Sequence, residues 1–128
     1  MAIASTFGQI YIKPKYERRA NSRVGITKIQ ITKKHTIVYC KYTSTFSGHA
    51  CVSPKMFIED LKTKKRYKLI KTEKIPLCPK QYMFSEAGHK FDFVLYFERV
   101  PHSVRYINMI EDMANGFNFY KIFLEPVA

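Results

Sequence analysis

Apolar and polar side chains alternate in several short segments of this chain, most clearly between residues 90 and 97. The residues of one parity there are all apolar: Phe91, Phe93, Leu95 and Phe97. Because a strand sends successive side chains to opposite faces, this segment predicts a strand with one apolar face. After Pro101 and Gly116, residues 117–124 form a second aromatic segment with apolar residues at both parities. Such a strand is expected to be covered on both sides or to face a partner.

Further short strands are predicted elsewhere in the chain. A first strand is expected over residues 7–13, and a polar, basic connection follows over residues 15–23. Two hairpins are expected next, each with a basic turn: residues 25–32 and 36–43 around 33–35, and residues 56–60 and 66–70 around 61–65. The remaining segments are a brief pairing stretch at 50–52, an extended two-proline link at 75–79, and a strand followed by a turn at 104–113.

Seven or eight such strands at this spacing, with no long helix, favour an antiparallel sandwich over a parallel α/β fold. A chain of 128 residues has the size of one domain and is long enough to bury its own core. We therefore expect residues 1–128 to form a single all-β domain.

Several segments from about residue 36 onward occur in a familiar order: Val52-Ser53-Pro54, Phe57-Ile58-Glu59-Asp60, Tyr67-Lys68-Leu69, Ile75-Pro76-Leu77, Phe93-Val94-Leu95-Tyr96-Phe97-Glu98, Met109-Ile110-Glu111 and Phe117-Asn118-Phe119-Tyr120-Lys121-Ile122. In this order the chain resembles a β-sandwich domain of unknown function that recurs in Bacteroidetes proteins, sometimes beside trypsin-like peptidase domains. It departs from that family at Lys74 and Lys121, where the family tends to carry glycine. The resemblance implies an immunoglobulin-like sandwich of about seven or eight strands in an envelope-facing setting. It implies no reaction.

The composition, 46% hydrophobic and 15% aromatic, argues against a disordered chain. No run approaches the roughly 18 apolar residues that span a bilayer, and the start lacks a basic segment followed by an apolar one. We therefore expect no transmembrane segment. The expected location is the cytoplasm, or the cell envelope or periplasm if a targeting segment has been removed.

Enzymatic chemistry has little support in the sequence. Ser47, His49 and Cys51 bring a hydroxyl, an imidazole and a thiol close together, but no carboxylate follows nearby to orient a base. Glu86 and His89 have metal-ligating side chains, yet no second pair accompanies them, so a turn is the expected structure. These segments are therefore predicted to be ordinary loops.

Glu111 and Asp112 are adjacent carboxylates, which we expect in an exposed turn or beside a lysine. Two catalytic carboxylates would have to face one another across a substrate. Among the three cysteines, Cys40 is expected to be a small buried hydrophobe in a strand, whereas a disulfide between Cys51 and Cys78 stays open. The five glycines are scattered singly, so no phosphate-binding loop is present. We predict no catalytic residue, no cofactor and no metal site.

The distribution of charge indicates a function more strongly than these candidate catalytic residues do. Residues 1–80 hold 18 Lys and Arg against 4 Asp and Glu, whereas residues 81–128 hold 4 against 6. The densest runs are Lys13, Lys15, Arg18, Arg19 and Arg23, and then Lys62, Lys64, Lys65, Arg66, Lys68, Lys71 and Lys74. From the second run we select as candidate polyanion-binding residues Lys62, Lys64, Lys65, Arg66 and Lys68. Aromatic residues beside the basic segments are Tyr11, Tyr16, Tyr39, Tyr42 and Tyr67.

Two interpretations of this charge are open. Lysine-rich turns keep a surface hydrated and prevent edge strands from pairing with other chains, and this role needs no ligand. Alternatively, the field concentrates an anionic surface, an acidic polymer or nucleic acid. We predict a non-enzymatic binding or protein-interaction module, with binding of nucleic acid or another polyanion through residues 1–80 as the alternative. A homo-oligomer is also open, in which residues 117–124 lie at an accessible edge or pair with another copy.

Overall fold

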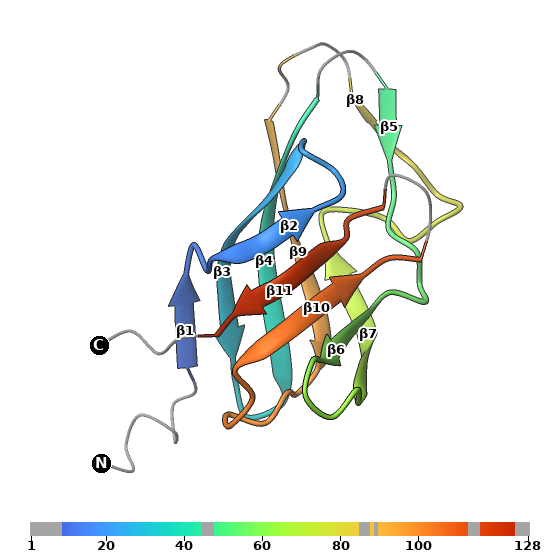
Figure 1. Ribbon diagram of the computed structural model, residues 1–128. Coiled ribbons are helices and arrows are strands. Elements are labelled where there is room, and N and C mark those ends of the chain that lie inside the picture. The colour runs from blue at the N-terminus through green and yellow to red at the C-terminus, as the bar shows by residue number, and fades with distance from the viewer. Residues whose placement is uncertain (1–8, 45–47, 85–87, 89, 113–115, 125–128) are drawn as a thin grey trace.

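The structure, a computed structural model, describes residues 9–44, 48–84, 88, 90–112 and 116–124. Nine of its strands form one antiparallel sheet in the order β1-β3-β4-β9-β7-β6-β10-β11-β2, and β5 pairs with β8 beside it (Figure 1). The strands are β1 (Gln9–Ile12), β2 (Tyr16–Arg19), β3 (Val24–Ile31), β4 (His35–Thr43), β5 (Gly48–Ala50), β6 (Phe57–Asp60), β7 (Arg66–Glu73), β8 (Tyr82–Phe84), β9 (Lys90–Glu98), β10 (Tyr106–Ile110) and β11 (Phe119–Phe123).

The all-β, antiparallel prediction is confirmed, but the immunoglobulin-like sandwich of two sheets is wrong. The large sheet is continuous and strongly curled into a half-barrel (Figure 1). Strand β7 makes it continuous, because its first residues pair with β6 and its later residues pair with β9. A shift in register between Leu69 and Lys71 accompanies this change of partner. Bulges of this kind bend a strand and increase its twist.

The concave side of the curled sheet holds the hydrophobic core. The four apolar residues of β9 are at most 7% exposed, which confirms the face predicted for residues 90–97. Fully buried side chains from other strands pack with them: Ile29, Ile31, Ile58, Ile107, Met109, Phe119 and Ile122. Burial of each such side chain contributes about 1.5–3 kcal/mol to folding, so this face supplies the main stabilisation.

Both predicted hairpins are confirmed, as β3–β4 and β6–β7. The second turn is organised by the buried side chain of Asp60. Its Oδ1 accepts a hydrogen bond from the Lys62 N–H at 2.9 Å, and its Oδ2 accepts one from the Thr63 hydroxyl at 2.9 Å. Aspartate commonly folds a turn in this way, by binding backbone groups two residues later.

The edges of the sheet differ from the prediction. Of the two alternatives predicted for residues 117–124, pairing with another copy stays a prediction, but the accessible edge is wrong, because β11 lies between β10 and β2. The strand that covers it, β2, falls in the segment predicted to be only a connection. Its sequence, Tyr-Glu-Arg-Arg, has no apolar alternation. The edge strands of the sheet are β1 and β2.

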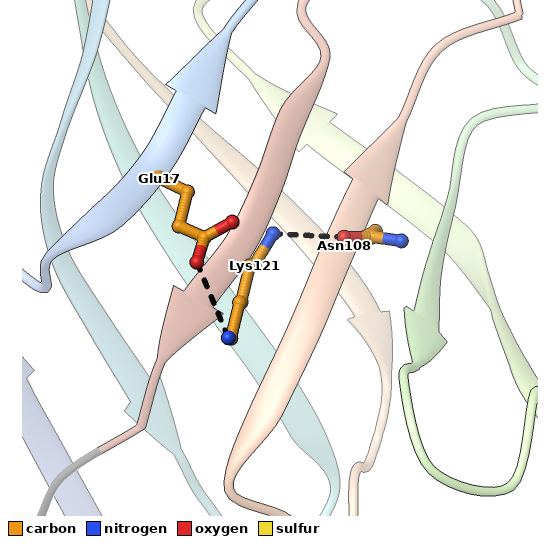
Figure 2. A network of polar contacts seen from close by, with 3 residues as sticks. All are labelled: Glu17, Asn108 and Lys121. Atoms are coloured by element: carbon orange, nitrogen blue, oxygen red, sulfur yellow. Dashed lines mark hydrogen bonds and ion pairs between the residues drawn. The ribbon is translucent and has the colours of Figure 1, made fainter.

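Four lysines have a left-handed backbone conformation that glycine adopts most readily: Lys13 with φ 44°, Lys64 with φ 67°, Lys74 with φ 71° and Lys121 with φ 54°. Lys121 lies in β11 at a break in register with β10. Its backbone N–H donates to Asn108 Oδ1 at 2.8 Å, and its Nζ lies 3.2 Å from Glu17 Oε2 on β2 (Figure 2).

Within the part of the chain that the structure describes, there is no helix long and apolar enough to cross a membrane.

Candidate anion-binding site

The predicted polyanion-binding residues lie in and after the β6–β7 turn, and all are exposed: Lys62, Lys64, Lys65, Arg66 and Lys68. Two of them are held over aromatic rings, since Lys65 Nζ is 5.5 Å from the Tyr67 ring centroid and Arg66 Cζ is 4.3 Å from that of Phe57. Cations over aromatic faces are stabilised by about 0.5–1 kcal/mol at exposed sites. The structure therefore gathers these residues at one end of the sheet.

The same arrangement recurs on the outer face of the β3-β4-β9-β7 part of the sheet. Lys28 Nζ is 4.2 Å from the Tyr39 ring centroid, and Lys71 Nζ is 4.6 Å from that of Tyr96. The Tyr96 hydroxyl donates to Glu73 Oε1 at 2.7 Å, and this hydrogen bond is the main cause that raises the pKa of Tyr96 to about 12. Across these four neighbouring strands, two rings on β4 and β9 are therefore flanked by one cation on β3 and one on β7.

The tyrosines noted in the sequence divide between core and surface. Tyr11, Tyr42 and Tyr67 are buried core residues, and burial raises the pKa of Tyr11 and of Tyr67. Tyr16 and Tyr39 are half-buried. Only the latter two are therefore available to a ligand at the surface.

The structure contains a second basic feature, which was not predicted as a site from the sequence. A hollow of about 420 Å³ lies beside β3, and we call it the basic hollow. Its cationic lining consists of Lys13, Arg19, Arg23 and Lys41, and Ser22, Thr27 and Thr43 are among its other lining residues. None of the described residues that line it is acidic.

Edge strand β2 and the first half of β3 form much of this hollow. β1 pairs with β3 from Lys28 onward, so β1 does not cover the Val24–Thr27 half of β3. The Lys13 N–H donates to Thr27 O at 2.9 Å, and Arg19 Nη1 donates to Val24 O at 2.9 Å. These two hydrogen bonds connect the residue after β1 and the end of β2 to β3. The second of them also holds the Arg19 guanidinium in place.

Lys41 enters the hollow from β4, where its neighbours across the strands are Gly25 on β3 and Asp92 on β9. Gly25 has no side chain, and a Cβ built there would meet the Arg19 guanidinium at 3.9 Å. The space beside Lys41 is therefore open toward Arg19. Lys13, Arg19 and Arg23 belong to the first dense run of basic residues in the sequence, but Lys41 does not. A bulge between Ile26 and Lys28 sets the register that places Lys41 opposite Gly25.

The candidate catalytic groups do not form an active site among the described residues. Cys51 is bonded to Cys78, with Cα atoms 5.1 Å apart, so its sulfur is not a thiol nucleophile. Ser47, Glu86 and His89, and the side chain of His49, lie outside what the structure describes. No group of metal-ligating residues comes together within the described ranges. Cys40 is buried, as expected, and burial raises the pKa of its thiol.

Glu111 is buried, which corrects the prediction of an exposed turn. Its Oε2 accepts the Ser53 N–H at 2.6 Å, and its Oε1 accepts the Phe117 N–H at 2.9 Å. The adjacent Asp112 is exposed. Glu111 therefore ties together two loops that are far apart in the sequence, and the pair does not face a common substrate site.

Comparison of the chain with protein-family models, with curated proteins and with solved structures finds no match.

Proposed function

We propose that the protein is a non-enzymatic binding module for an acidic polymer, and that the cationic outer surface of residues 1–80 makes the contact. The observation that carries this proposal is the arrangement of the cations. They lie over aromatic rings or around a hollow with no acidic residue in its described lining. A cluster of this kind has a positive field, which attracts polyanions.

An acidic polysaccharide is the polymer class that fits best. The Cys51–Cys78 disulfide favours an oxidising compartment outside the cytoplasm, where acidic polysaccharides are abundant and nucleic acids are not the usual partners. The envelope-facing setting implied by the resemblance agrees with this location.

The test is binding of the oxidised protein to a sulfated polysaccharide across a salt series, with a neutral dextran and single-stranded DNA in parallel. We expect binding to the sulfated chain that weakens steeply as salt rises, and none to dextran. Absent or salt-insensitive binding would contradict the proposal. Markedly tighter binding to DNA would replace the polysaccharide with nucleic acid as the partner.

Charge-neutralised variants locate the contact. Lys62→Gln with Lys65→Gln removes two exposed cations from the β6–β7 turn. The matched control, Lys90→Gln with Arg105→Gln, removes two exposed cations from the nearly neutral remainder of the chain. We expect the first pair to weaken polysaccharide binding several-fold more than the control. Equal losses would mean that net charge alone attracts the polymer.

A further inference from the structure

We infer that the basic hollow binds one tetrahedral oxyanion group, a phosphate or sulfate monoester, together with part of the sugar that carries it. This inference rests on the proposed function and names the chemical group that the module recognises. It places recognition of that group at a single site, apart from the general attraction of the outer surface.

Convergence of charge is the first argument. Lys13, Arg19, Arg23 and Lys41 come from four different segments, namely the residue after β1, the end of β2, the residue before β3, and the middle of β4. Folding brings them around one space, although like charges repel one another. A phosphate monoester carries about 1.5–2 negative charges near neutral pH, so it offsets this repulsion more fully than a singly charged carboxylate does. A sulfate monoester is singly charged, but like phosphate it presents three acceptor oxygens to donors that converge from several sides.

The second argument is that Arg19 is already oriented. One of its terminal nitrogens donates to Val24 O at 2.9 Å, which holds the guanidinium at the wall of the hollow. A guanidinium has five N–H donors, so donors remain for a ligand. Their planar arrangement matches two oxygens of a phosphate or sulfate group.

The third argument is the size and chemistry of the space. Hydroxyl groups of Ser22 and Thr43 add uncharged donors to the lining. The volume of about 420 Å³ falls within the range of roughly 300–1,000 Å³ typical of small-molecule sites. It exceeds what a bare oxyanion needs, so there is room for part of the sugar.

Asp92 provides a way to tune the site without altering its lining. It faces Lys41 across the β4–β9 pair, and both side chains are exposed. Directly opposed residues of opposite charge attract one another across strands. Removing the carboxylate therefore leaves more of the Lys41 charge for a ligand.

The experiment titrates the protein at low salt with glucose 6-phosphate, glucose 6-sulfate and glucuronate, and follows backbone amide shifts by NMR. We expect saturable binding of an ester at the amides of Gly25 and Lys41, and weaker binding of glucuronate. A preference for phosphate or for sulfate identifies the ester. Equal affinity for glucuronate, or shifts that do not saturate, would overturn the inference.

Three variants separate charge from shape. Lys41→Gln should weaken ester binding about threefold to tenfold, and Asp92→Asn should tighten it about twofold. Gly25→Val keeps the net charge and suits a strand, but it fills the space beside Arg19, so it should abolish the saturable shifts. The control Lys33→Gln with Lys34→Gln removes two exposed cations at the far end of β3, about 25 Å away along the strand.

The outcomes distinguish the two proposals. Suppose that the wild type binds the sulfated polysaccharide, but Gly25→Val binds the esters as well as the wild type does. The ester site then lies elsewhere, so the inference about the hollow is wrong while the proposed function stands. If the control variant weakens ester binding as much as Lys41→Gln does, the hollow is likewise not the site. If the wild type fails to bind the polysaccharide, the proposed function itself is wrong.

Discussion

The contact around Glu111 and the basic hollow beside β2 are both built from charged residues, and they differ in what satisfies the charge. Glu111 is 2% exposed, and two backbone N–H groups donate to its carboxylate. In the hollow, cations from four segments surround an open space whose described lining offers no carboxylate. The first arrangement is complete within the chain, whereas we propose that a ligand completes the second. In this protein, a cluster of charged residues is therefore a candidate binding site where its described lining holds no residue of opposite charge.

The largest expected effect concerns the disulfide beside the Glu111 contact. Cys51→Ser with Cys78→Ser opens a link between residues 27 apart, which should lower the free energy of unfolding by about 3 kcal/mol. Urea denaturation measures this loss. Anion affinity should stay unchanged while the variant is folded, because the hollow lies on other strands. A loss of anion affinity in the folded variant would contradict the proposal that the basic hollow is independent of the region around Glu111.

Glu111→Gln should follow, with a loss of about 2–3 kcal/mol in the free energy of unfolding. The amide replaces one carboxylate oxygen with a donor, so one of the N–H groups of Ser53 and Phe117 loses its acceptor. The neighbouring Asp112→Asn is the matched control, and since Asp112 is exposed its effect should stay within about 0.5 kcal/mol. Equal effects at the two positions would show that Glu111 is not a structural tie.

A smaller effect is expected at Lys74 and Lys121, two of the four lysines with left-handed backbones. Lys74→Gly should raise the free energy of unfolding by up to about 1 kcal/mol, because glycine adopts this conformation without strain. Lys121→Gly should gain less, since it also removes the ion pair with Glu17 and contacts with two aromatic rings. Thermal and urea unfolding of both variants would check the order. A larger gain at Lys121 would mean that its contacts contribute nothing.

The smallest effect is a dependence on alkaline pH. The Glu73 hydrogen bond raises the folded-state pKa of Tyr96 from 10.0 to about 12. The folded protein therefore holds this proton more tightly than the unfolded chain does. The resulting stability is present below pH 10 and is lost as pH rises toward 12. Tyr96→Phe should show a shallower fall in Tm over this window, and identical slopes would contradict the assignment.

Much of the fold was predictable because the strands alternate in the ordinary way. The aromatic face of β9 and the two hairpins follow from period and turn residues. The predicted arrangement of the strands, a sandwich of two sheets, was wrong. Local alternation predicts which residues share a face, but it does not predict that β7 changes partner at a bulge and joins nine strands into one curled sheet.

The site was less predictable for the same reason. The basic residues of the β6–β7 turn are neighbours in the sequence, so their clustering was evident. The hollow depends on β2, a strand of charged residues with no alternation, and on the bulge that places Lys41 opposite Gly25. The burial of Glu111 was not predicted, because no pattern in the neighbouring sequence indicates that the N–H groups of Ser53 and Phe117 reach its carboxylate.

The most direct test of the contrast is a map of backbone amide shifts on adding a sulfated oligosaccharide to the wild-type protein at low salt. The account predicts shifts at Gly25, Lys41 and Thr43 around the hollow and at Lys64 in the β6–β7 turn, with the amides of Glu111 and Phe117 unmoved. Shifts concentrated around Glu111 and Phe117, with the hollow unaffected, would contradict it.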